Sequence, residues 1–121
     1  MKNQDLSFEI EFCRSILRRQ PNDVALLEML AGFLTRTGRI REGLELDRRI
    51  VRLEPDNPVG HYNLACSLSL KNCPEDAIVS LREALERGYE DFDWMMEDPD
   101  LEEVRRQPEF RALIAEFKTA T

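Results

Sequence analysis

The chain has 121 residues and a formal net charge of −7, and its length suits one domain with a modest apolar core. Hydrophobic residues make up 42% and charged residues 34%, while glycines and prolines number only five and six, which excludes a disordered chain and a loop-rich sandwich. The negative charge repels phosphate backbones and anionic lipid surfaces, so we expect neither nucleic-acid nor membrane binding.

The N-terminus and the cysteines indicate a reducing compartment. The first residues lack the uninterrupted apolar run of a signal peptide, and no window approaches the roughly 20 apolar residues of a membrane span. Cys13, Cys66 and Cys73 are irregularly spaced and include no Cys-x-x-Cys pair, which is typical of reduced structural thiols. We therefore predict a cytoplasmic protein.

Residues 5–20 form the first expected helix, with an apolar row at Ile10, Cys13, Ile16 and Leu17. Phe8 and Phe12 lie beside this row, and two interpretations stay open for them. Either they fold back onto the following helices, or they form a self-association surface for a homodimer.

Residues 24–57 and 58–91 each read as a helical hairpin. Apolar residues of the first segment recur every three or four positions in two runs, Leu27, Leu30, Leu34 and then Ile40, Leu44, Ile50, Leu53. Gly38 in the first segment and Asn72 in the second mark the turn between two helices, because both residue types tolerate a left-handed backbone. Pro21 and Pro55 end the preceding helices.

A shift of 34 residues brings the two hairpins into register. Leu30-Ala31 falls on Leu64-Ala65, and Arg48 falls on Arg82. The same shift aligns residues 5–20 with the second helix of a hairpin, so this segment corresponds to a half repeat. A fixed period of this length is the signature of a repeat protein.

A helical hairpin of 34 residues with a closing proline resembles the tetratricopeptide-repeat (TPR) family. The matching positions are Leu27, Leu30, Ala31, Leu34, Gly38, Gly43, Ile50 and Pro55 in the first hairpin, and His61, Leu64, Ala65, Leu68, Asn72, Ala77, Leu81 and Ala84 in the second. Asp47 stands where the family has an aromatic residue, and Gly88-Tyr89 replaces the second closing proline. The resemblance implies an all-α fold, a short α-solenoid in which antiparallel helix pairs form a right-handed superhelix.

The C-terminal segment 92–121 is similar to the segment that closes many bacterial TPR arrays. Its apolar anchors are Phe92, Trp94, Met95, Leu101, Val104, Phe110, Leu113, Ile114 and Phe117. Asp100 and Pro108 stand at the expected starts of short helices. We therefore expect one domain, residues 1–121, in which two hairpins lie between an N-terminal half repeat and a C-terminal helical cap.

The resemblance also implies a binding surface, because the first helix of each TPR hairpin lines a concave groove that accepts extended or helical peptides. The matching positions are Ala25, Glu28, Met29, Gly32, Thr35, Arg36, Tyr62, Asn63, Cys66 and Ser69. Among them, Tyr62 is expected to act as a rigid aromatic anchor. Glu28 and Gly32 stand where some members carry the lysine and asparagine that clamp a terminal carboxylate, so we do not expect that ligand.

The sequence contains no motif for catalysis or cofactor binding. His61 is the single histidine, so no His-pair metal site or Ser-His-Asp arrangement can form within one chain. We expect no enzyme activity, no cofactor and no metal. The leading interpretation is a scaffold or adaptor that binds a protein or peptide, and the alternatives are a self-associating structural module and an accessory subunit of an enzyme.

Overall fold

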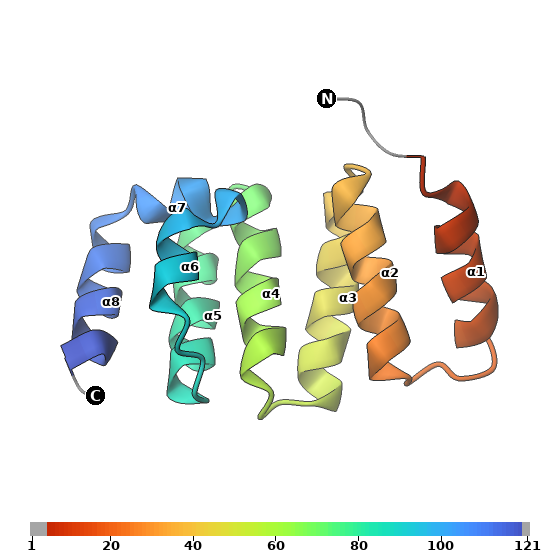
Figure 1. Cartoon of the computed structure of the whole chain (residues 1–121), viewed down its shortest axis with the longest axis horizontal. Helices are drawn as coiled ribbons and strands as arrows, with labels where there is room; N and C mark the ends of the chain where they lie inside the picture. Colours follow the sequence, from red (N-terminus) through yellow and green to blue (C-terminus); the bar gives the residue numbers. More distant parts are fainter. Residues whose placement is uncertain (1–4, 120–121) are drawn as a thin grey trace.

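The computed structural model describes residues 5–119, and this part of the chain is all-helical (Figure 1). Its elements are α1 (Ser7–Leu17), α2 (Val24–Arg36), α3 (Ile40–Leu53), α4 (Pro58–Leu70), α5 (Pro74–Glu86), α6 (Phe92–Glu97), the 3-10 helix η1 (Pro99–Leu101), α7 (Glu102–Arg105) and α8 (Pro108–Thr119). Helices α1 to α5 stand side by side in chain order, and each contacts the next. The expected domain limits at residues 1 and 121 lie outside the described residues.

The helix starts repeat at the spacing seen in the sequence. Helix α4 begins 34 residues after α2, and α5 begins 34 residues after α3. The same spacing separates Gly38 (φ 85°) from Asn72 (φ 64°), which give each hairpin turn its left-handed residue. It also separates Asp23 from Asn57, whose side chains accept backbone N–H groups at the N-termini of α2 and α4. Equivalent residues therefore produce equivalent turns and caps in the two hairpins.

The core divides into two apolar clusters. The smaller cluster joins α1 to α2 through Ile10, Cys13, Leu30 and Leu34. The larger cluster spans α4, α5 and the C-terminal helices, and at its centre Ala65, Ala77 and Ala84 are fully buried. Short side chains at these positions let neighbouring helices approach closely. No helix within residues 5–119 has the length and apolar character required to cross a bilayer.

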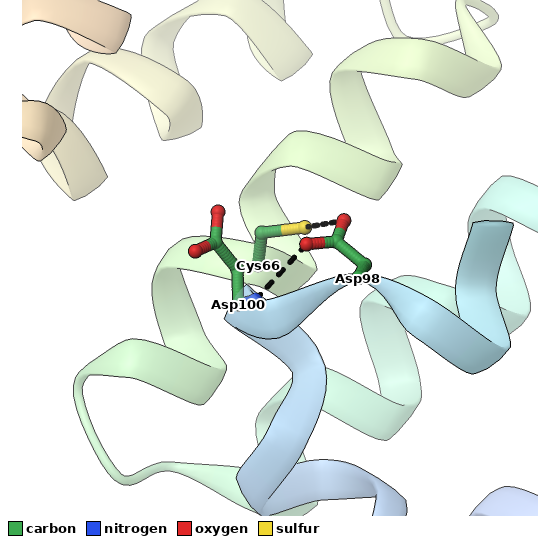
Figure 2. A group of neighbouring side chains, drawn as sticks. All are labelled: Cys66, Asp98 and Asp100. Carbon is green, nitrogen blue, oxygen red and sulfur yellow. Dashed lines mark hydrogen bonds between the residues drawn. The ribbon is translucent and has the colours of Figure 1, made fainter.

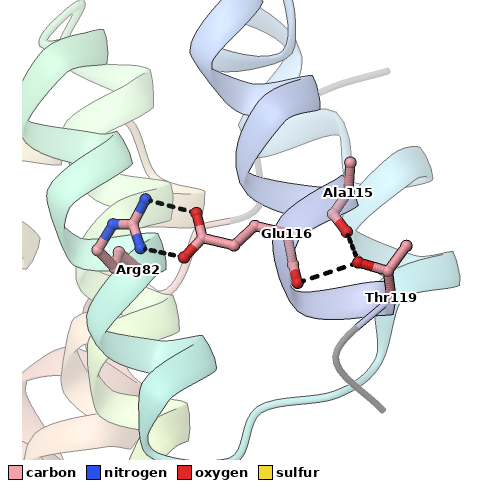
Figure 3. A network of polar contacts seen from close by, with 4 residues as sticks. All are labelled: Arg82, Ala115, Glu116 and Thr119. Atoms are coloured by element: carbon pink, nitrogen blue, oxygen red, sulfur yellow. Dashed lines mark hydrogen bonds and ion pairs between the residues drawn. The ribbon is translucent and has the colours of Figure 1, made fainter.

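The C-terminal helices cover the hairpin formed by α4 and α5. Contacts join α4 to η1 and α7, and join α5 to α7 and α8. Most of the predicted apolar anchors are buried, but Trp94 is 44% exposed. The Arg82 guanidinium on α5 donates to both carboxylate oxygens of Glu116 on α8, at 2.8 and 3.1 Å (Figure 3). Its guanidinium carbon also lies 5.8 Å from the Phe117 ring centroid. This exposed ion pair orients α8 on α5 and adds little stability by itself.

Phe8 and Phe12 form an exposed aromatic pair on the outer face of α1. Phe8 is 77% exposed and Phe12 53% exposed, and their rings stack with centroids 6.2 Å apart. The interpretation in which they fold back onto the following helices is therefore wrong, because the face of α1 that packs on α2 is already filled by Ile10 and Cys13. The self-association interpretation stays open.

At Gly43, α3 lies close to α2, and this contact allows a test of the hairpin packing. A Cβ at this position would lie 2.7 Å from the Thr35 Oγ1 and 3.4 Å from the Ala31 carbonyl oxygen. We predict that Gly43→Leu lowers the free energy of unfolding by about 1–3 kcal/mol, because overpacking outweighs the gain in helix propensity. Urea unfolding monitored by circular dichroism measures this change.

The matched control is Gly32→Ala, since a Cβ at Gly32 has no neighbour within 4 Å. This variant should gain roughly 0.5–1 kcal/mol from helix propensity alone. Equal stability of the two variants would contradict the close packing of α2 and α3.

Candidate functional site

A pocket of about 330 Å³ opens where α2 and α4 meet the C-terminal cap. Helices α2 and α4 contribute most of its lining, α3 contributes Asp47, and the cap contributes Trp94, Asp98 and Asp100. Helices α1, α5 and α8 contribute no lining residue. The pocket therefore lies on the first helices of the two hairpins and is closed at one side by the cap.

The structure brings seven of the ten predicted groove residues to this pocket: Glu28, Gly32, Thr35, Arg36, Tyr62, Asn63 and Cys66. Ala25 and Met29 are exposed on α2 but lie outside the pocket. Ser69 is only 1% exposed, because α3, α5 and the cap all pack against α4. Its side chain is therefore not available to a ligand.

Tyr62 lines the pocket but is not the exposed anchor that the sequence suggested. Its side chain is 3% exposed, and its ring stacks on Tyr89 at a centroid distance of 4.3 Å and an interplanar angle of 6°. The Tyr62 hydroxyl donates to Asp98 Oδ2 at 2.6 Å. The residue therefore links α4 to the cap and forms a fixed wall of the pocket.

The sequence interpretation missed Asp47, Trp94, Asp98 and Asp100. Asp47 had a signal, since it departs from the aromatic residue of the TPR pattern and aligns with Leu81 at the 34-residue shift. The other three belong to the cap, where no repeat exists to assign a face. Asp100 had been placed at a helix start, but the N-cap of η1 is Asp98, whose side chain accepts the Asp100 backbone N–H at 3.0 Å.

Asp98 is the polar centre of the site (Figure 2). Its carboxylate is 5% exposed, and Oδ1 accepts the Asp100 N–H while Oδ2 accepts the Tyr62 hydroxyl and the Cys66 thiol, the last at 3.6 Å. Arg105 donates at 2.7 Å to the Asp98 backbone carbonyl rather than to the carboxylate. The buried negative charge is thus stabilised by neutral donors.

Cys66, Asp98 and Asp100 place a thiol sulfur and two carboxylate oxygens within 4.8 Å of one another. These donors do not fit a metal site in the arrangement seen here, because both Asp98 oxygens already accept hydrogen bonds from protein groups. Burial, together with the neighbouring carboxylates of Asp98 and Asp100, raises the pKa of the Cys66 thiol. The thiol is therefore held protonated and donates to Asp98, whose side chain is the N-cap of η1.

Asp47 is a second buried carboxyl group in the pocket, 5% exposed on α3. The Ser67 hydroxyl of α4 donates to its Oδ2. Burial raises the pKa of Asp47 to about 7, with a further increase from Glu28 on α2 and an opposing decrease from the Ser67 hydrogen bond. The junction of α2, α3 and α4 therefore holds an acid that titrates near neutral pH.

Two further carboxyl groups of the pocket, Glu28 and Asp100, also have raised pKa values. Burial, followed by the charge of Glu54, raises the pKa of Glu28. Burial, followed by the charge of Asp98, raises the pKa of Asp100. Raised values mean that the pocket disfavours negative charge in the absence of a bound cation.

No family model matches the sequence. The chain is similar to a chloroplastic protein from Arabidopsis thaliana, with 35% identity over 86 residues. The match covers 69% of this chain and 26% of that protein, so the chain spans about a quarter of the length of the curated relative that it matches.

The raised pKa of Asp47 predicts that Asp47→Asn stabilises the fold at neutral and alkaline pH. The pKa of Asp47 is 3.8 in the unfolded chain and about 7 in the folded chain. Between these two pH values the folded chain keeps a proton that the unfolded chain has already released, so the free energy of unfolding of the wild type falls as the pH rises. The amide keeps an acceptor for Ser67 and carries no charge. Urea unfolding should show a gain of roughly 1–3 kcal/mol at pH 8 that shrinks toward pH 4.

Glu45→Gln provides the control, because Glu45 is exposed on the same helix. Its effect on the free energy of unfolding at pH 8 should be small. A destabilised Asp47→Asn protein at pH 8 would show that the ionised carboxylate is favourable where it stands.

Proposed function

We propose that this chain is a protein-interaction module, a short right-handed α-solenoid of the TPR type whose pocket between α2 and α4 binds a segment of a partner protein. One observation carries the proposal: the first helices of two consecutive hairpins, with the cap, enclose a pocket of about 330 Å³. Concave sites formed between secondary-structure elements are the usual location of binding sites. The repeat of helix starts, turns and caps at 34 residues supports the TPR assignment.

The proposal includes no chemistry by the chain itself. The thiol nearest the pocket, Cys66, is a poor nucleophile because its pKa is raised. The Nε2 atom of His61 lies 2.7 Å from the Pro55 carbonyl oxygen, and His61 is not among the pocket residues. From the sequence we propose the cytoplasm as the compartment of this chain. The similar protein from Arabidopsis thaliana is chloroplastic.

Site-specific photo-crosslinking tests the pocket as the binding surface. We predict that p-benzoylphenylalanine at Asn63, which is exposed in the pocket, captures a partner protein in cells of the source organism. Gly32→Trp should abolish the capture, because a Cβ at Gly32, which lines the pocket, meets no atom of the fold within 4 Å, so that an indole placed there would occupy the pocket. Mass spectrometry of the cross-linked bands identifies the partner.

Val79 on α5 supplies the matched control, since it is 64% exposed and lies outside the pocket. The crosslinker at position 79 and the variant Val79→Trp should leave the partner unaffected. The same bands from both positions, or bands from Asn63 that persist in Gly32→Trp, would exclude the pocket.

A second candidate function is self-association through α1. The supporting observation is the exposed stacked pair Phe8 and Phe12 on α1. Helix α1 stands at one end of the row of helices (Figure 1). Each repeat of a helical array buries its face on a neighbour, and within residues 5–119 the helix that packs against α1 is α2. A second copy of the chain would cover the other side.

Phe12→Glu should convert such a dimer to a monomer without loss of helix content, because Phe12 is 53% exposed and outside the core clusters. Sedimentation equilibrium over a range of concentrations measures the change. Glu11→Gln, at an exposed neighbouring position, is the control. A wild-type protein that stays monomeric at every concentration would remove this candidate.

A further inference from the structure

We propose that the pocket accepts a basic side chain, lysine or arginine, presented by the partner protein. This inference rests on the proposed function and names the chemistry of the residue that the pocket would recognise.

The pocket carries an excess of carboxyl groups without ion-pair partners. Its lining includes Glu28, Asp47, Asp98 and Asp100. Within residues 5–119, none of these four forms an ion pair with a lysine or arginine, although six such contacts occur elsewhere on the surface. Two of the four, Asp47 and Asp98, are only 5% exposed and have neutral hydroxyl donors in place of a cation.

Arg36, the one basic residue in the lining, does not neutralise this excess. Its guanidinium carbon lies 5.3 Å from the centroid of the Phe33 ring on its own helix. This cation–π contact directs the charge toward Phe33 instead of toward the carboxyl groups. The pocket therefore keeps the carboxyl groups of Glu28 and Asp100, which have no ion-pair partner within residues 5–119, for a cation from outside.

The size and rim of the pocket fit a long basic side chain. A volume of about 330 Å³ is at the lower end of ligand pockets and accommodates one or two side chains rather than a large cofactor. Trp94 lines the pocket and is 44% exposed, so its indole ring offers an apolar surface for the methylene groups and a π face for the charge. A basic side chain has both of these parts, whereas an apolar or acidic side chain lacks the charge that the carboxyl groups would pair with.

The fold is also consistent with a cation that arrives only on binding. In the absence of a ligand, the Tyr62 and Ser67 hydroxyls stabilise the carboxyl groups of Asp98 and Asp47. A bound cation would form charge-assisted hydrogen bonds with carboxyl groups of the pocket that are already oriented. An acidic ligand would face the four carboxyl groups and the net charge of −7.

Selection from a random library of displayed linear peptides, followed by synthesis of the strongest binders, tests the inference. We expect the selected peptides to share one lysine or arginine, and replacement of that residue by acetyl-lysine or citrulline should weaken binding about tenfold or more. The double variant Glu28→Gln, Asp100→Asn should cause a similar loss. Isothermal titration calorimetry measures the affinities, and circular dichroism checks the fold, which should be at least as stable because both pKa values are raised.

Glu45→Gln, Glu90→Gln is the matched control, because it removes the same amount of charge from exposed positions outside the pocket. It should leave the affinity nearly unchanged. An equal loss in both double variants would assign the effect to the net charge of the chain and overturn the inference.

Other outcomes separate the inference from the proposed function. If the selected peptides lack a basic residue and do not bind the Gly32→Trp variant, the pocket is a binding site but the inference of a basic side chain is overturned. Peptides that still bind Gly32→Trp, or no peptides at all, would overturn both. If zinc chloride binds in the micromolar range and the double variant Glu28→Gln, Asp100→Asn loses this binding, the ligand of the pocket is a metal ion and the inference is overturned. If the double variant instead breaks a dimer, the ligand is a second copy of the chain and the inference is likewise overturned.

Discussion

The buried carboxylate of Asp98 is the interaction on which the arrangement of the cap depends. It accepts the Tyr62 hydroxyl of α4 and the backbone N–H of Asp100, and so it joins the last hairpin to the start of η1. Arg105 binds the carbonyl oxygens of Met95 and Asp98 from the other side. Apolar anchors alone would allow the cap to slide along α4, whereas a buried charge is tolerated only when its hydrogen bonds are formed. The same contact fixes Asp98 and Asp100 in the wall of the pocket.

The pocket contains a buried carboxyl group, Asp47, that is unfavourable for the stability of the fold. Asp47 occupies the position that Leu81 fills in the next hairpin, and a buried acid there is less favourable than an apolar side chain. Local departures from the packing pattern of a fold are expected at functional sites, where stability is exchanged for binding. The departure at Asp47 and the acids of the cap meet in one pocket although they are far apart in the sequence. This convergence gives the pocket its acidic character.

The sequence predicted the repeating helices and turns and most of the apolar anchors of the cap, but it did not predict which polar residues of the cap line the pocket. The 34-residue period placed the turns at Gly38 and Asn72, and the apolar periodicity placed the helices. Burial on α4 was harder to predict, because this helix contacts α3, α5 and the cap, so Tyr62 and Ser69 were assigned to a surface that the cap covers. Helical periodicity tells which residues share a face, but it does not tell which other segment packs on that face. For the same reason the sequence did not show that Asp98, a cap residue, contacts α4.

The two candidate surfaces are separated within the molecule, and this separation has consequences for binding. The pair Phe8 and Phe12 lies on α1, which contributes nothing to the pocket, so a second copy seated on α1 would leave the pocket open. A dimer formed in this way would present two acidic pockets at a fixed spacing. A partner with two suitably placed basic residues would then bind through both pockets, and the second contact would form at a high effective concentration. A single small pocket gives modest affinity, so pairing of two pockets is the physical route by which a module of this size could hold a partner tightly.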